Sequence, residues 1–125
     1  MVSEFKNEPT LDFNEESNRR KQFEALELVQ SRLGCEYDLI IGDEHLKSPS
    51  TFKSINPGNK SQVIGVFQTA TAEQAIFAID VAGAAFQSWK RVAAQDRADL
   101  LFRTAGLLRA RRFECNAWMI LEVGK

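Results

Sequence analysis

The residues best suited to covalent chemistry are two cysteines and a single histidine. Cys35 and Cys115 stand eighty positions apart without a Cys-x-x-Cys spacing, and His45 is the only histidine. This set is too small for a zinc site of the usual Cys/His kind. A Cys–His nucleophilic pair also needs a third group that orients the base, and the sequence offers no evident one. We therefore expect both cysteines to be buried free thiols, structural or incidental in role, as in a reducing compartment.

Other catalytic patterns are equally weak. The seven glycines are scattered and form neither a G-x-G-x-x-G run nor a Walker loop, so no local phosphate cradle is encoded. Ser50 and Lys53 match an S-x-x-K pattern, but they fall in a segment that reads as loop and strand rather than helix. The carboxylates have no spacing typical of general acid–base pairs. The residues alone therefore identify no active site.

Basic side chains concentrate in one segment, which is the only candidate for binding an anionic partner. Residues 90–112 contain seven basic and two acidic residues, whereas the whole chain has a net charge of −1. On a helix, Arg103 and Arg109 lie about 120° apart, so the arginines do not form one continuous ridge. A solvated helix face is favoured, with weak nucleic-acid binding at 90–112 as the alternative.

Composition places the chain among globular proteins. It has 125 residues, of which 44% are hydrophobic and 26% charged. No apolar run approaches the roughly 20 residues that a membrane helix requires, and the polar N-terminus does not resemble a secretory signal. We expect one cytoplasmic domain with a real core, without membrane or nucleic-acid partners.

The first elements that must position any site are an N-terminal arm and a helix. Residues 1–13 are polar and irregular, and residues 14–34 are predicted to form an amphipathic helix. Asn14 is the expected N-cap and Gly34 the left-handed stop. The apolar residues at helical spacing are Phe23, Leu26, Val29 and Leu33.

Short strands are predicted within residues 37–68. A strand at 37–41 is followed by the hairpin turn Gly42-Asp43 and a returning strand at 44–47. Strands at 51–55 and 61–68 flank the turn at 56–59. No helical crossover separates these strands, so we expect them to be antiparallel.

Helices are predicted over residues 71–125. Thr71 and Gln74 form a capping box for a helix that ends near Trp89. The expected stripe on this helix consists of Ala75, Ile76, Ile79, Ala82, Gly83 and Phe86. The next helix starts at Ala94 or Gln95, with a buried stripe of Leu100, Leu101, Thr104, Leu107 and Leu108. A bend is expected near 111–113, followed by a helical stretch to Val123. The predicted class is α+β, with short antiparallel strands between an N-terminal helix and two or three C-terminal helices.

Five segments, taken in order, resemble the start of an aldehyde dehydrogenase. Residues 38–44 (DLIIGDE) resemble the family's first hairpin, and residues 54–65 (SINPGNKSQVIG) are similar to its NPxxxxxIG strand–turn–strand. Residues 69–89 and 97–108 resemble the two following helices, and residues 121–125 (LEVGK) resemble the LExGK signature. The N-terminal arm, with Lys6-Asn7-Glu8-Pro9, is similar to the 1-pyrroline-5-carboxylate (glutamate-γ-semialdehyde) dehydrogenase branch of this family.

The resemblance implies NAD⁺-dependent oxidation of glutamate semialdehyde to glutamate, a step of proline breakdown. It implies that residues 1–125 are the N-terminal part of a longer aldehyde dehydrogenase α/β fold, free-standing or the second half of a bifunctional enzyme. The catalytic cysteine and glutamate, and the NAD-binding elements, would then lie beyond Lys125. We accordingly expect the chain alone to be inactive, to bind no NAD, and to pair with the remainder of the dehydrogenase.

The resemblance also implies part of a structural monovalent-cation site. Family members use a backbone carbonyl just before the NP turn and the acidic residue of LExGK, which match Ile55 and Glu122. The remaining ligand would lie downstream, so the implied site is incomplete. A surface role for Glu122 is the alternative. A different class of function, a non-catalytic module that self-associates through exposed apolar helix faces, is also left open.

Overall fold

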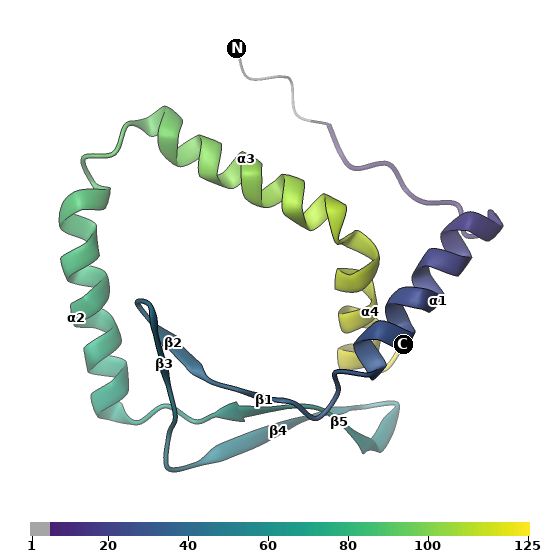
Figure 1. The fold of residues 1–125 in the computed structure, drawn as a ribbon, viewed down its shortest axis with the longest axis horizontal. Helices are drawn as coiled ribbons and strands as arrows, with labels where there is room; N and C mark the ends of the chain where they lie inside the picture. Colours follow the sequence, from purple (N-terminus) through teal and green to yellow (C-terminus); the bar gives the residue numbers. More distant parts are fainter. Residues whose placement is uncertain (1–5) are drawn as a thin grey trace.

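The computed structural model describes residues 6–125 as helices that frame a set of short strands (Figure 1). The helices of this part of the chain are α1 (Glu16–Gln30), α2 (Ala72–Trp89), α3 (Ala94–Ala110) and α4 (Arg112–Val123). Its strands are β1 (Glu36–Tyr37), β2 (Leu39–Ile41), β3 (Glu44–Leu46), β4 (Thr51–Asn56) and β5 (Asn59–Gln68). The predicted α+β class is confirmed. No helix within residues 6–125 is long and apolar enough to cross a membrane.

The strands form two small sheets, and one pairing corrects the prediction. β2 and β3 form an antiparallel hairpin, and β4 pairs antiparallel with β5. β1, however, pairs parallel with β5, with Glu36 opposite Val66. The prediction of only antiparallel strands was wrong. A parallel pair needs a long connection between its two strands, but that connection does not have to contain a helix. Here the hairpin and β4 provide that connection.

The predicted strand at 37–41 is divided at Asp38. β1 belongs to the sheet of β4 and β5, whereas β2 belongs to the hairpin. The Asp38 carboxylate lies 2.7 Å from Lys47 Nζ, just after β3, which holds the division in place. The turn at Gly42 is as expected, with a φ of +63° that favours glycine.

The core lies where α1 and α4 pack together over β5. Its buried members are Ala25, Val29, Ile64, Ala117 and Leu121. On the predicted apolar face of α1, Val29 is in the core and Leu26 and Leu33 pack against it, but Phe23 is 64% exposed and Gln22 is buried in its place. Small Ala25 and Ala117 allow the two helices to approach closely, and this packing decides which face of α1 turns inward.

The ends of α1 also differ from the prediction. Glu15, not Asn14, is the N-cap, and its side chain makes no capping hydrogen bond. The Asn14 amide instead donates to Asp12 Oδ1 at 2.8 Å, so Asn14 lies in a turn before the helix. The helix ends at Gln30, and Gly34 follows with a φ of +76°.

The C-terminal helices follow the predicted boundaries closely, but their predicted stripes are not buried. The capping box joins Thr71 and Gln74, and Arg111, with φ −104° and ψ 20°, separates α3 from α4. Neither α2 nor α3 contains a buried residue. The periodicity correctly identified apolar faces, but nothing within residues 6–125 covers them.

Candidate functional site

The residues first considered for covalent chemistry are not brought together. Both cysteines are free thiols, but the expected burial is wrong for Cys35, which is exposed in the segment before β1, while Cys115 on α4 is half-buried. His45 lies in β3 with its Nδ1 3.8 Å from Asp38 Oδ2. No hydrogen bond in the described part of the chain joins His45 to either cysteine. These residues therefore form no nucleophile–base pair.

His45 instead borders a charged cluster that fixes the hairpin to β1. Lys47 Nζ lies 2.7 Å from Asp38 Oδ1 and 2.8 Å from Glu36 Oε1. Hydrogen bonds to Asp38 and then Glu36 raise the pKa of Lys47. Hydrogen bonds from Lys47 and then Gln68 lower the pKa of Glu36. One ammonium group thus joins two carboxylates, one in β1 and one just after it, which suits a structural tether.

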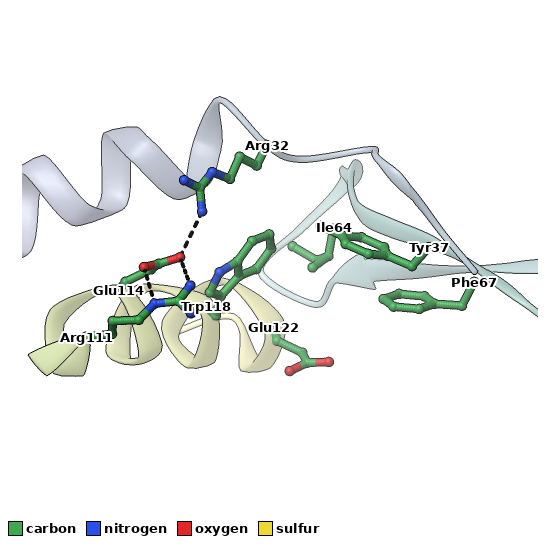
Figure 2. Close-up of a pocket in the computed structure, with 8 residues that line it drawn as sticks. All are labelled: Arg32, Tyr37, Ile64, Phe67, Arg111, Glu114, Trp118 and Glu122. Carbon is green, nitrogen blue, oxygen red and sulfur yellow. Dashed lines mark hydrogen bonds and ion pairs between the residues drawn. The ribbon is translucent and has the colours of Figure 1, made fainter. Parts of the chain in front are cut away.

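A pocket of about 470 Å³ lies between the end of α1, β1, β5 and α4 (Figure 2). One end is ionic and the other is aromatic. The residues that line it are Arg32, Tyr37, Ile64, Phe67, Arg111, Glu114, Trp118 and Glu122.

At the ionic end, one carboxylate holds two guanidinium groups. Arg111 donates from Nε to Glu114 Oε2 at 3.0 Å and from Nη2 to Oε1 at 2.8 Å. Arg32, from the segment after α1, donates to Glu114 Oε1 at 2.8 Å. The hydrogen bonds from Arg111, more than the charges of Arg111 and Arg32, lower the pKa of Glu114. Glu114 thus remains ionised near neutrality and cannot act as a general acid there.

At the aromatic end, two rings stack beside a strand glycine. The Tyr37 and Phe67 rings lie 5.2 Å apart at 15°. A Cβ added at Gly65 would lie 3.0 Å from both rings, so glycine is required for this close approach. The pairing of β1 with β5 brings the two aromatic residues together.

This pocket has room for a small chemical group, but its lining residues include no nucleophile paired with a base. Neither Cys35, Cys115 nor His45 is among its lining residues. Glu122 is exposed on α4 and points away from the ionic cluster in Figure 2. The geometry indicates a structural or docking pocket rather than a catalytic centre.

The two residues expected to hold a cation lie on elements that meet. The β4–β5 register shifts on both sides of Ile55, which marks a bulge before the turn. The end of α4 reaches that turn, because a Cβ added at Gly124 would lie 2.6 Å from the Gly58 nitrogen. No group of three or more potential metal-ligating side chains occurs within residues 6–125. Ile55 and Glu122 therefore lie on neighbouring elements, and their role as cation ligands stays a prediction.

Two of the seven basic residues in the segment 90–112, Arg109 and Arg111, are paired with carboxylates. Arg109 Nε donates to Glu8 Oε1 at 2.7 Å, and this hydrogen bond lowers the pKa of Glu8. Arg112 donates to the Pro9 carbonyl at 3.3 Å, and Arg111 is held by Glu114. The N-terminal arm thus crosses the junction of α3 and α4. These contacts reduce the charge available to a nucleic acid.

The ionic end of the pocket was not predicted from the sequence. Arg32 and Glu114 are separated by 82 positions, so no local pattern connects them. The i,i+3 spacing of Arg111 and Glu114 was the one available signal.

Comparisons with known proteins agree on one family. The sequence profile of the aldehyde dehydrogenase family matches residues 45–125. The 1-pyrroline-5-carboxylate dehydrogenase of Geobacillus thermodenitrificans is 43% identical over 125 residues, and that of Staphylococcus epidermidis is 42% identical. Each match covers 100% of this chain and 24% of the relative, so the chain spans about a quarter of these relatives' length.

Solved structures give the same result. A Thermus 1-pyrroline-5-carboxylate dehydrogenase with bound NAD superimposes with a TM-score of 0.94 at 38% identity. The match covers 99% of this chain and 24% of that one. Proline utilization A from Bdellovibrio bacteriovorus also gives a TM-score of 0.94, at 36% identity, over 98% of this chain and 13% of its own.

Proposed function

The chain belongs to the aldehyde dehydrogenase family, and we propose that it forms the N-terminal quarter of a cytoplasmic, NAD-dependent 1-pyrroline-5-carboxylate dehydrogenase. The observation that supports this proposal most directly is the match to the Thermus enzyme with bound NAD, which extends over 99% of this chain. The reaction is the oxidation of glutamate semialdehyde to glutamate. Residues 6–125 contribute scaffold to it, because none of their groups forms a nucleophile with an adjacent base.

The residues described here do not themselves fit a dinucleotide. A helix N-terminus is the usual phosphate site, but the Thr71 side chain already accepts from the Gln74 amide at the start of α2. The first turn of α3 carries Asp96, whose charge opposes a phosphate. NAD would supply the hydride acceptor from a site on the remainder of the enzyme, which is the proposed partner of this chain.

A chimaeric enzyme tests the proposal. Residues 1–125 of this chain would replace the matching quarter of the Geobacillus thermodenitrificans enzyme, and NAD reduction would be measured with glutamate semialdehyde. We expect turnover by the chimaera and none by the 125-residue chain alone. A folded chimaera that oxidises other aldehydes but not glutamate semialdehyde would contradict the proposed substrate, and activity of the chain alone would contradict its scaffold role.

We also propose that the Ile55 carbonyl and the Glu122 carboxylate contribute to a monovalent-cation site in the whole enzyme. The bulge at Ile55 and the contact of α4 with the β4–β5 turn support this proposal. Sodium or potassium, compared with choline at equal ionic strength, should raise the Tm of the chimaera. Glu122→Gln should remove that difference; an equal response in both proteins would argue against the site.

A further inference from the structure

One apolar face of α2 has no partner within residues 6–125. The face consists of Ala75, Ile79, Ala82, Gly83 and Phe86, hereafter the α2 face. Ile79 is 70% exposed and Phe86 is 55% exposed. None of its residues is charged, so exposure of this face to water is energetically unfavourable.

The opposite side of α2 is already in use. Gln74 Nε2 donates to the Lys47 carbonyl at 2.9 Å. Val81 Cγ1 would be 3.3 Å from a Cβ added at Gly42 of the hairpin turn. Val81 lies about 200° around the helix from both Ile79 and Gly83. The hairpin therefore fixes which way α2 is turned and leaves the α2 face pointing away from it.

Gly83 indicates that something approaches this face closely. Glycine is the poorest helix former except for proline, and Gly83 lies in the interior of an 18-residue helix. A Cβ added there would meet nothing within 4 Å. Its φ is not positive either, so no contact or backbone conformation within the described residues requires glycine. A missing side chain between Ile79 and Phe86 suits the close approach of another backbone.

The comparisons favour one occupant for this face. In the Thermus enzyme the same fold, with a TM-score of 0.94, is 24% of a longer chain. The rest of that chain must fit around an arrangement of helices and strands like this one. A covalently continuous segment is also present at a much higher effective concentration than a second copy. Both arguments favour the rest of the dehydrogenase over self-association.

We infer that the α2 face is the docking surface for the remainder of the dehydrogenase chain, which places an apolar, uncharged backbone segment against Gly83. This inference rests on the proposed function and specifies its partner surface. Figure 1 shows that α2 lies beside the tip of the β2–β3 hairpin and is linked to α4 through α3. Docking of the remainder would therefore brace the side of the helix that faces away from the hairpin.

The test uses the 125-residue chain, tagged and co-expressed with the Geobacillus thermodenitrificans enzyme lacking its matching quarter. Complex formation is measured by size exclusion with light scattering, and affinity by titration. We expect a one-to-one complex with the wild-type chain. Gly83→Leu and Ile79→Asp should weaken it by at least about tenfold, because one overpacks the contact and the other buries a charge in it.

Ser88→Leu is the matched control. It adds the same side chain to α2 about 140° from Gly83, outside the α2 face. We expect it to leave the affinity unchanged. Gly83→Leu should not lower the Tm of the isolated chain, since its side chain enters open space, so a misfolded variant would be recognised.

Three results would overturn the inference: no complex with the wild-type chain, equal affinities for Gly83→Leu and Ser88→Leu, or a homodimer through the α2 face that excludes the remainder. None of these depends on turnover. If the chimaera is active but one of these three results is found, the proposed function stands and the docking surface is rejected. If the complex depends on the α2 face but the chimaera does not oxidise glutamate semialdehyde, the docking surface stands and the proposed function is rejected.

Discussion

Glu114 is the residue on which the ionic end of the pocket depends, and its pKa predicts a pH effect. Its carboxylate joins Arg111 to Arg32, and the hydrogen bonds from Arg111 hold its pKa below 4.5 in the folded chain. A lowered folded pKa contributes stability above about pH 4.5 that is lost as the pH falls below that value. Glu114→Gln should therefore lower the Tm at pH 7 by about 4 °C, the effect of losing about 1 kcal/mol in a domain of this size.

The same measurement in acid separates this effect from packing. The Tm difference between wild type and Glu114→Gln should shrink as the pH falls below 4.5, because the wild-type carboxyl becomes protonated. Glu27→Gln, an exposed change on α1, serves as the control and should be nearly neutral throughout. If the Tm difference stays constant from pH 7 to below pH 4.5, the charge of Glu114 is not the cause of the stability difference.

At the scale of elements, substitutions at three glycines separate the cost of a left-handed backbone conformation from the cost of a steric clash. Gly124 caps α4 with φ +70°, and a Cβ there would lie 2.6 Å from the Gly58 nitrogen. Gly34 has φ +76° but open space, and Gly83 has neither constraint. Substitution by alanine should cost most at Gly124, about 1–2 kcal/mol at Gly34, and should stabilise the isolated chain by about 1 kcal/mol at Gly83.

Urea unfolding of the three alanine variants measures this order. Equal costs at Gly124 and Gly34 would mean that the β4–β5 turn moves aside, so that the contact of α4 with this turn contributes nothing. A loss of stability for Gly83→Ala would mean that α2 is more closely surrounded in this chain than Gly83 indicates. The m-values should be unchanged, since none of the variants alters the surface exposed on unfolding.

Elements whose signals are local could be predicted, and those set by packing could not. The capping box of Thr71 and the turn at Gly42 depend on residues within four positions of one another, and both were confirmed. On the inward face of α1, Leu26, Val29 and Leu33 were predicted correctly, but Phe23 was not, because contact with α4 selects Gln22 in its place. The parallel pairing of β1 was missed for the same reason, since its partner β5 begins more than twenty positions later.

The site illustrates the same division across the whole molecule. The family motifs could be recognised because each is contiguous in sequence. The pocket could not, since Arg32 and Glu114 meet only after α1 folds onto α4. The stripes of α2 and α3 were correctly identified as apolar, but the stripe of α3 was incorrectly expected to be buried, because periodicity reports a face and not its partner.

This uneven burial predicts an uneven distribution of stability in the isolated chain. All the members of the core belong to α1, β5 and α4, whereas α2 and α3 contain no buried residue. Helices held mainly by their ends open locally at a lower free energy than the core. Interior amides of α2 and α3 should therefore exchange with deuterium at least about tenfold faster than those of β5 and α4.

In the chimaera, where the remainder of the dehydrogenase is present, this difference in exchange rate should diminish, most of all in α2. Uniform protection in the isolated chain would mean that the capping box and helix propensity alone hold α2, and would remove the need for a docked partner.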